Sequence, residues 1–303
     1  MIYYKNCPIC KNKNLLIIKK NFFIEYSKKS YYLCKCSKCY HVFVKNPPNQ
    51  NCITKYYKKK FWNDKIIINN EDINWKKILN KTPGSVERYF RATRQYKFIS
   101  KYIKDKKKRI LDYGSGYSPL MFIFKKKKFE NLHVFEYDQS IIKYLRTQGI
   151  NNYNKKKNKF DLICLSHVLE HVLDPVRFIK SLKKNLHKKT LIYFDVPFQD
   201  YKEQFSENCH LHFFSKRSMQ ILFKEFKLID YNIEIHGFLD RFLLKIFFFF
   251  YKKFFFEKGK KITNPSIILK YTHKIWIYIK NISFSNINIF ISRKDFYGIF
   301  IPQ

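Results

Sequence analysis

The stretch Arg109-Ile-Leu-Asp-Tyr-Gly-Ser-Gly-Tyr-Ser-Pro-Leu120 decides the fold of this chain. Only 7 glycines occur among its 303 residues, and two of them, Gly114 and Gly116, stand here one residue apart. Glycine permits a tight turn and also lets the backbone come close to a ligand. The stretch therefore predicts a short strand, a glycine turn and a helix that begins near Leu120.

On both sides of this turn, short apolar runs alternate with amphipathic stretches. Strands are expected at residues 109–111, 132–135, 161–165, 190–194, 227–235 and 287–293, with a reduced strand at 149–154. Helices are expected at residues 86–103, 120–126, 140–148 and 174–187. Such alternation indicates an α/β fold with a doubly wound, mostly parallel, seven-stranded Rossmann-like sheet that is covered by helices on both faces.

A carboxylate follows the strand after the glycine turn. Glu136 stands 20 residues beyond Gly116. Because the carboxyl ends of adjacent parallel strands meet, we expect this side chain beside the turn, where it can accept bonds from both hydroxyls of a ribose. A dinucleotide site would need G-x-G-x-x-G, but the last position is Pro119. The pattern favours a nucleoside without a pyrophosphate; a structural turn with an unrelated surface glutamate is the alternative.

The first 49 residues carry a different signal. Cys7-Pro-Ile-Cys10 and Cys36-Ser-Lys-Cys39 form two C-x-x-C pairs, which is the spacing of a structural zinc site with four thiolates. Aromatic, β-like runs at 21–26, 30–33 and 41–44 accompany them, so the segment is expected to be a small zinc-ribbon-like module. Cys34 is an alternative to Cys36 as a ligand. The remaining cysteines, Cys52, Cys164 and Cys209, have no partner by spacing.

Several of these stretches resemble a known family. Ile110-Leu-Asp-Tyr-Gly-Ser-Gly116 looks like the first motif of class I S-adenosylmethionine-dependent methyltransferases, and Val134-Phe-Glu-Tyr-Asp138 resembles their second-strand acid. Residues 160–175 are very similar to the fourth-strand segment of the branch with a Leu-Glu-His motif. Residues 191–197 and 210–215 match its fifth strand and its H-x-x-x-F-S element. With the C-x-x-C pairs ahead, the chain resembles the subgroup that includes deoxysugar C-methyltransferases.

The resemblance implies S-adenosylmethionine as the cofactor. Asp112, Gly114 and Gly116 would line its methionine part, and Glu136 would hold its ribose. Family members usually have a third glycine two residues after Gly116, where this chain has Ser118.

The resemblance also places three histidines beside the cofactor and the acceptor. They are His167, which would also contact the cofactor, His171 and His210, and His210 is the candidate general base. For His167, His171 and His212 a packed or solvated role is the alternative. C-methylating relatives carry E-H-x-x-Y-F-S, whereas this chain has cysteine and phenylalanine in place of the glutamate and the tyrosine. C-, O- and N-methylation therefore all stay open.

The composition limits the partners less than the charge suggests. A net charge of +38 is typical of nucleic-acid or membrane-surface binding. However, the lysines are spread in short runs such as 125–128 and 155–157, and Lys, Asn, Ile, Phe and Tyr are the residues of AT-rich codons. Both a selected basic surface and compositional drift remain open. The N-terminus lacks the pattern of a secretory signal, so a cytoplasmic location is expected.

Three regions are expected along the chain: a zinc module at 1–49, a helical linker at 50–105 and a cofactor-binding domain at 106–303. The domain carries a Phe- and Lys-rich helical insert at 238–280. Its mixture of aromatic clusters and lysines is consistent with peripheral contact to a membrane surface. A cap over the substrate cleft and a dimer contact are the alternatives.

The favoured function is methyl transfer from S-adenosylmethionine to a small molecule, with a nucleotide-linked sugar or a surface-glycan precursor as candidate acceptor. An RNA or DNA methyltransferase that uses the basic surface is one alternative. However, this chain lacks the N/D-P-P-Y element that base-aminomethylating enzymes have after the fourth strand. A nucleic-acid partner is therefore not expected. The other alternative is a non-catalytic binding protein with a relic cofactor pocket. The oligomeric state is open.

Overall fold

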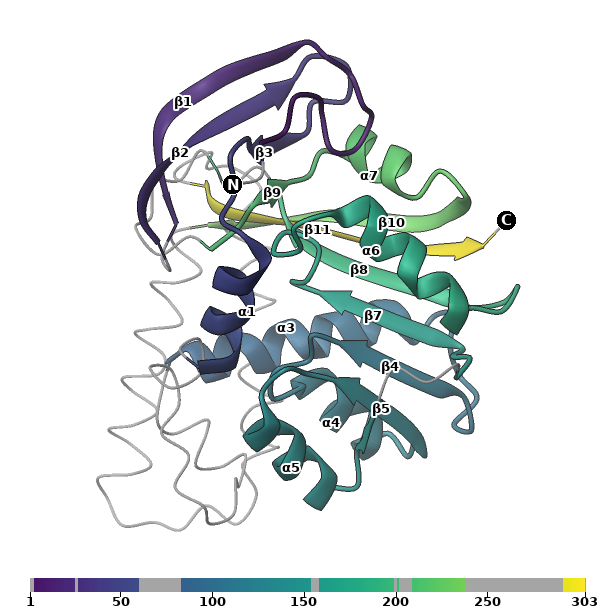
Figure 1. Ribbon diagram of the computed structural model, residues 1–303. Helices are drawn as coiled ribbons and strands as arrows, with labels where there is room; N and C mark the ends of the chain where they lie inside the picture. The colour runs from purple at the N-terminus through teal and green to yellow at the C-terminus, as the bar shows by residue number, and fades with distance from the viewer. Residues whose placement is uncertain are drawn as a thin grey trace. The chain divides into compact units, whose positions relative to one another are not determined.

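The computed structural model describes residues 3–24, 27–59, 83–153, 158–198, 201, 209–237 and 291–302 (Figure 1). The chain divides into two compact units. The larger unit combines 1–67, 96–234 and 294–303, and all of the sites considered below belong to it. Of the smaller unit, which combines 68–95 and 235–293, the described residues are the first part of a helix and the ends of two strands.

A seven-stranded sheet forms the centre of the larger unit, in the order β10-β11-β8-β7-β4-β5-β6. Its strands are β4 (Arg109–Tyr113), β5 (Asn131–Phe135), β6 (Asn151–Asn152), β7 (Leu162–Ser166), β8 (Leu191–Pro197), β10 (Phe226–Gly237) and β11 (Ile291–Pro302). The strands from β8 to β6 are mutually parallel, and β11 is antiparallel to β8. The predicted mostly parallel, seven-stranded Rossmann-like sheet is confirmed.

The strand order fixes where a ligand can bind. From β4 the chain adds β5 and β6 on one side, and then returns to place β7 on the other side of β4. Such a reversal is a topological switch point, and open α/β sheets bind ligands there, beyond the carboxyl ends of the strands. The glycine turn follows β4 and the turn with His167 follows β7, so both lie at this point.

The described helices are α1 (Gln50–Lys59), α3 (Pro83–Ile99), α4 (Pro119–Lys126), α5 (Gln139–Thr147), α6 (Pro175–Leu182) and α7 (Lys216–Leu222). Several of them begin at a side-chain cap. Asp138 caps α5, Asp174 caps α6, and Ser215 and Ser218 form a reciprocal capping box on α7. Each cap satisfies backbone N–H groups that the first helical turn leaves without partners.

Several predicted elements end elsewhere than expected. The helix expected at 86–103 is α3, which ends at Ile99. The helix expected at 174–187 stops at Leu182 and continues as the 3-10 turn η1 (Lys183–Asn185). The buried Asn185 side chain donates to the Asn158 carbonyl, and the Asn185 carbonyl accepts from Phe160 N, which ties the chain back to the start of β7. Helix continuation would break these bonds.

The last strand extends further along the chain than predicted. Residues 287–290 lie outside the described residues, and β11 runs from Ile291 to Pro302. The predicted strand ended at the charged run 293–295. In the structure the strand continues past this run, and Phe296 and Phe300 are buried against β8 and β10. Gly298 allows this close packing, because a Cβ there would lie 2.6 Å from the Asp230 carbonyl oxygen.

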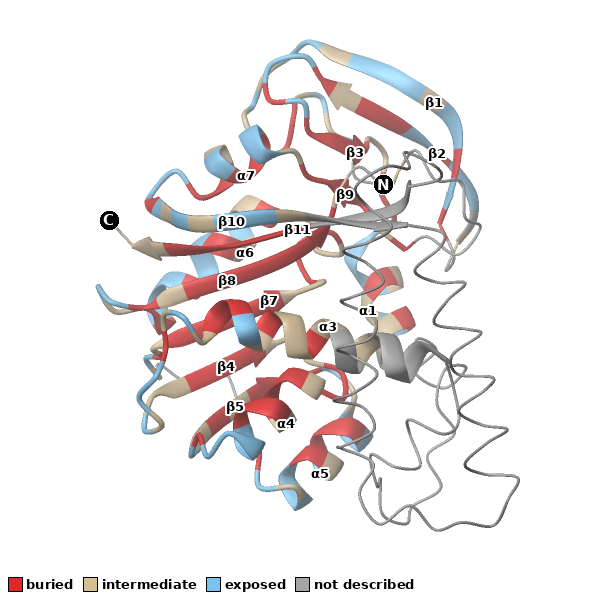
Figure 2. Ribbon diagram, turned by 180° about the vertical axis from the view of Figure 1, so that it is seen from behind, coloured by how far each residue is buried: buried red, intermediate tan, exposed pale blue. Residues whose placement is uncertain are grey.

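The N-terminal residues form a second sheet, with the order β1-β2-β3-β9. Its strands are β1 (Leu15–Ile24), β2 (Ser27–Cys36), β3 (Val42–Val44) and β9 (His212–Phe213). The predicted runs at 21–26, 30–33 and 41–44 fall on or beside the first three strands. The fourth strand comes from the far side of the sequence, because Val42 pairs with Phe213 and Phe43 with His212. The buried interiors of both sheets are red in Figure 2.

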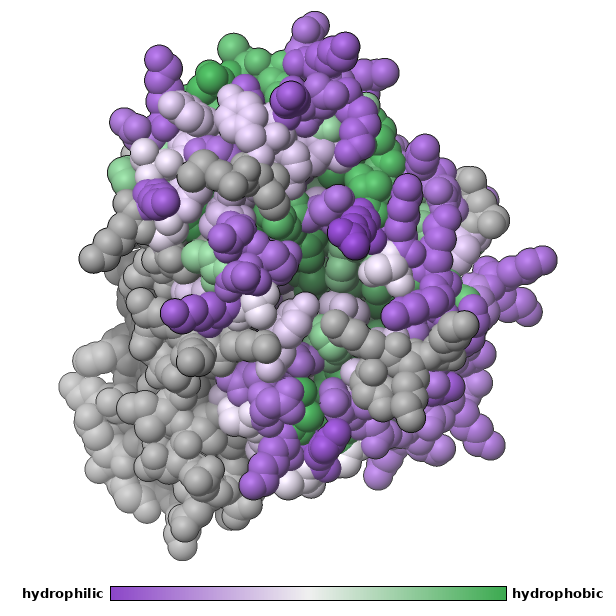
Figure 3. All heavy atoms as spheres, viewed as in Figure 1, coloured by the Kyte–Doolittle hydropathy of each residue, from purple (hydrophilic) through white to green (hydrophobic). Residues whose placement is uncertain are grey.

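The described surface is largely hydrophilic in the view of Figure 3. One of the basic runs, residues 125–128, is exposed at the C-terminal end of α4. Hydrophobic side chains reach the surface on the β1–β2 hairpin, where Leu16 and Phe23 are more than half exposed (64% and 57%). No helix among the described residues has the length and apolarity to cross a bilayer. The insert at 238–280 and the residues 60–82 of the expected linker lie outside the described residues.

Candidate functional site

The glycine turn closes tightly over the end of β5. Gly114 and Gly116 both have positive φ (68° and 52°), a region that side chains with a Cβ rarely adopt. Gly114 N and Ser115 N donate to the Phe135 carbonyl at 2.8 and 3.2 Å. A Cβ on Gly114 would also lie 2.9 Å from Cγ2 of Val168 in the turn after β7. The two glycines therefore serve the turn geometry and the close approach of the neighbouring turn.

Ser118 explains how the turn forms without a third glycine. Ser118 adopts the left-handed conformation (φ 48°), which glycine reaches without strain, and its hydroxyl donates to Asp112 Oδ2 at 2.6 Å. Asp112 is buried at the end of β4, and burial raises the pKa of this carboxyl to about 7, while the Ser118 hydroxyl and Glu136 act on it in opposite directions. The hydrogen bond offsets the backbone strain at Ser118.

Glu136 is held in one orientation by the turn. Its Oε2 accepts from Gly116 N at 2.7 Å, and its Oε1 accepts from Tyr137 N at 2.6 Å and from Asp138 N at 3.3 Å. Burial raises the pKa of Glu136, and the three N–H donors lower it. The structure thus brings the predicted acid onto the predicted glycine turn, and each carboxylate oxygen keeps lone pairs for a further donor.

The turn after β7 carries the Leu169-Glu170-His171 motif. His167 has a positive φ (53°), its backbone N donates to the Asp195 carbonyl, and its Nδ1 lies 3.0 Å from Glu170 Oε1. Because Val168 of the same turn packs against Gly114, this motif borders the glycine turn. His167 therefore lies in the turn that borders the glycine turn.

His171 and His210 come together, with two partners that the sequence did not indicate. Their rings lie 4.8 Å apart between centroids. Tyr57 of α1 is hydrogen-bonded to His171 Nδ1 at 2.8 Å, and Cys209 Sγ lies 3.6 Å from the same nitrogen. Cys209 is buried, and nothing in the sequence indicated its contact with His171, because spacing along the chain carries no information on a neighbour 38 residues away.

His212 takes the packed role that was its alternative. It is only 2% exposed in β9, and its Nδ1 is hydrogen-bonded to His41 Nε2 at 3.0 Å. Burial lowers the pKa of His212 to about 4. This histidine joins β9 to the N-terminal sheet, and it is not placed to accept a proton from a bound ligand.

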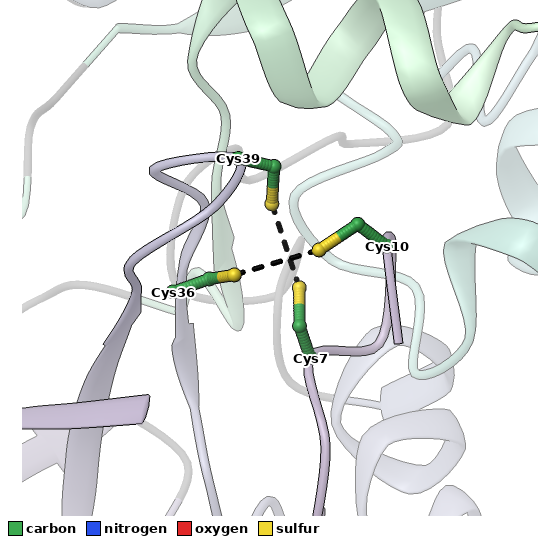
Figure 4. A group of neighbouring side chains, drawn as sticks. All are labelled: Cys7, Cys10, Cys36 and Cys39. Carbon is green, nitrogen blue, oxygen red and sulfur yellow. Dashed lines mark hydrogen bonds between the residues drawn. The ribbon is translucent and has the colours of Figure 1, made fainter. Parts of the chain in front are cut away.

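The four predicted cysteines converge in the N-terminal sheet (Figure 4). Sγ of Cys7 lies 3.6 Å from Sγ of Cys39, and Sγ of Cys10 lies 3.4 Å from Sγ of Cys36. A tetrahedral zinc ion with Zn–S bonds of about 2.3 Å has S···S edges of about 3.8 Å, so the four thiols fit one ion. Cys34, the alternative to Cys36, is buried outside this cluster.

The two C-x-x-C turns have the same backbone pattern. In each turn, the backbone carbonyl of the first cysteine accepts a hydrogen bond from the backbone N of the residue four positions later. The donors are Lys11 N in one turn and Tyr40 N in the other, both at 3.0 Å. Both of these residues have positive φ (63° and 58°). The hydrogen bond between Cys7 and Cys39 lowers the pKa of the Cys7 thiol and raises the pKa of the Cys39 thiol. Two equal turns that face each other are suited to a closed four-thiolate site.

Comparisons with known proteins agree with this arrangement. Residues 86–228 match the family model described as methyltransferase domain. The tRNA U34 carboxymethyltransferase of Campylobacter fetus subsp. fetus (strain 82-40) is 24% identical over 187 residues, which are 54% of this chain and 64% of that protein. The chain thus spans less than two thirds of the length of this curated relative.

The solved structures give the fold. Coclaurine N-methyltransferase bound to N-methylheliamine and SAH superposes with a TM-score of 0.50 over 82% of each chain, at 9% identity. The family match begins in α3 and ends in β10, so it contains the glycine turn, Glu136 and the motif after β7. Residues 86–228 of this chain, just under half of its length, are therefore similar to the methyltransferase domain family and share the fold of a solved methyltransferase.

Proposed function

We propose that this chain transfers a methyl group from S-adenosylmethionine to a small molecule, with a nucleotide-linked sugar or a surface-glycan precursor as the acceptor. One observation supports it above the others: the bond from Gly116 N to Glu136 Oε2 at the carboxyl ends of adjacent parallel strands. That bond pre-orients a carboxylate beside a glycine turn, which is the arrangement needed to bind the ribose of a nucleoside cofactor.

The remaining cofactor contacts follow from this anchor. Gly114 and Gly116 would lie along the methionine part, where the turn leaves no side chain in the way. Asp112 lies behind them, and burial places its pKa near neutrality, at about 7. The ammonium group of a bound methionine part would stabilise the charged form of this carboxyl. His167 would contact the cofactor from the turn after β7.

The zinc ion of the proposal is structural. Four thiolates from Cys7, Cys10, Cys36 and Cys39 would leave no open position, so the ion would hold the N-terminal sheet and take no part in methyl transfer.

At the acceptor end, methyl transfer from a sulfonium is an in-line displacement, so alignment of donor and acceptor supplies much of the rate. A base is needed where the acceptor proton is not acidic enough to leave alone. His210 is the candidate, since it is part-exposed and lies against His171 in the segment before β9.

We expect His210→Ala to bind S-adenosylmethionine normally but to lose roughly 10²–10⁴-fold in turnover, which is the usual effect of removing a positioned base. The measurement is release of S-adenosylhomocysteine with a panel of nucleotide-linked sugars, beside cofactor calorimetry. His187→Ala is the matched control, because His187 precedes β8 at the opposite end of the sheet. His212→Ala is expected to lower stability more than turnover, since His212 is buried. Near-normal turnover of His210→Ala would show that His210 only packs the site.

A second function, RNA modification, is favoured by one relative and by the charge. The curated relative is a tRNA carboxymethyltransferase, and the net charge of this chain is +38. If the acceptor is a small molecule, labelled S-adenosylmethionine will transfer no label to bulk tRNA. In a gel mobility assay, any binding of tRNA by the protein will then disappear at physiological salt, because the affinity of non-specific binding to phosphates falls steeply with salt. Label in tRNA, together with a shift that persists at that salt, would establish the RNA function instead.

A further inference from the structure

A cluster of three metal-ligating side chains lies apart from the four cysteines. His171, Cys209 and His210 each offer one ligand atom, and these atoms lie within 4.8 Å of one another. They come from two segments, the turn after β7 and the stretch just before β9. The backbone holds the two segments together, because Leu211 N donates to the Glu170 carbonyl at 2.7 Å and His212 N donates to it at 3.2 Å.

The distance between the thiol and one imidazole fits an edge of a tetrahedral zinc site. With a Zn–S bond of about 2.3 Å and a Zn–N bond of about 2.05 Å, the S···N edge of a tetrahedron is about 3.6 Å. The observed distance from Cys209 Sγ to His171 Nδ1 is 3.6 Å. His171 and His210 are only part-buried, so an ion can reach the cluster from solvent.

The surroundings of His171 are also those of a ligand. When Nδ1 binds an ion, Nε2 carries the proton, and the carboxylate of Glu170 lies on that side, with Oε1 at 3.8 Å from Nε2. Glu170 is 1% exposed, so its charge is poorly solvated and favours a nearby cation. At 3.8 Å the contact is an ion-pair distance and not a hydrogen bond, so Glu170 would support a metal-bound imidazole through its charge.

We propose that His171, Cys209 and His210 bind a second zinc ion, and that its fourth position is open. Two imidazoles and one thiolate are a ligand set that zinc accepts, and three protein ligands with an open position are typical of catalytic rather than structural zinc. Binding releases the Cys209 thiol proton to solvent. It also replaces the hydrogen bond between His171 Nδ1 and the Tyr57 hydroxyl.

Resting on the proposed function, the open position would take a hydroxyl oxygen of the methyl acceptor. The ion lowers the pKa of a bound hydroxyl, which then gives its proton to solvent. The resulting oxygen attacks the methyl carbon, the carbon–sulfur bond breaks, and its electron pair stays on sulfur to give neutral S-adenosylhomocysteine. In this arrangement His210 acts as a ligand rather than as a base, and the acceptor class narrows to hydroxyl compounds.

The experiment is a zinc count on the full chain, purified without a histidine tag. We expect Cys209→Ser to contain one zinc fewer per chain than the wild type, and His171→Ala to show the same loss. Cys52→Ser is the matched control, because Cys52 lies on α1 outside both clusters, and it should keep the wild-type count. Equal zinc in the wild type and in Cys209→Ser would overturn the proposal.

Cobalt substitution of the wild type covers the case in which a variant does not fold. Two equivalents of cobalt should bind with different spectra, one dominated by four thiolates and one with a single thiolate. Saturation at one equivalent would also overturn the proposal. Neither readout depends on methyl transfer, whereas the proposed function fails if the wild type shows no S-adenosylmethionine binding in calorimetry. The two failures are therefore distinguishable.

Discussion

Glu136→Ala is expected to weaken S-adenosylmethionine binding by roughly 10²–10⁴-fold, because it removes the acceptor of two ribose hydroxyls. A hydrogen bond to a charged group contributes about 1.5–3 kcal/mol, and each 1.4 kcal/mol is a factor of ten in affinity. The structure adds a second cause. The carboxylate also accepts from the backbone N of Gly116, Tyr137 and Asp138, so its loss leaves the glycine turn without its anchor. Isothermal titration calorimetry measures the effect directly.

Two further variants separate the two causes. Glu136→Gln keeps one acceptor oxygen and can still bond to Gly116 N, so its loss of affinity should be smaller and should reflect the ribose contact. Glu130→Ala is the control, because Glu130 is an exposed carboxylate just before β5. Wild-type affinity in Glu136→Ala would refute the assignment of Glu136 as the ribose acceptor.

Loss of the structural zinc is expected to unfold the N-terminal sheet. Binding of a structural zinc ion contributes about 10–16 kcal/mol in small peptides, and a module of this size has little core of its own. Cys39→Ser should abolish zinc at this site, since Cys39 is the second cysteine of one C-x-x-C turn and its Sγ lies 3.6 Å from that of Cys7. Elemental analysis of the purified protein gives the zinc content, and amide hydrogen exchange gives the extent of unfolding.

The unfolding should reach beyond the first 49 residues. Ser215 donates to the Cys39 carbonyl at 2.7 Å, His41 is bonded to His212, and β3 pairs with β9. Exchange protection should therefore fall at residues 211–215 as well as in β2 and β3. Cys34→Ser is the control and should keep both zinc and protection, because Cys34 lies outside the cluster. A zinc-free Cys39→Ser that keeps its protection would contradict the proposal.

The sequence by itself determined the features that depend on short spacings. The alternation of strands and helices, the glycine turn with Glu136 and the two C-x-x-C turns all follow from residues that are neighbours in the chain or at the ends of adjacent strands. Backbone geometry alone constrains such patterns. It is for this reason that a mostly parallel, seven-stranded sheet was expected and that the structure brings Glu136 onto Gly116.

Only the tertiary structure decided the features that join distant segments. Nothing in the local pattern pairs β3 with β9, brings Tyr57 and Cys209 to His171, or shows that Ser118 supports the turn through Asp112. The same histidine-rich segment before α7 contains the part-exposed His210 and the buried His212, and burial separates their roles. These contacts form because packing buries apolar surface and pairs polar groups, whatever their separation in the chain. In the pairs His41–His212 and Tyr57–His171 the partners are more than 100 residues apart. The hydrophobic pattern of a segment does not indicate a partner that is so distant in the sequence.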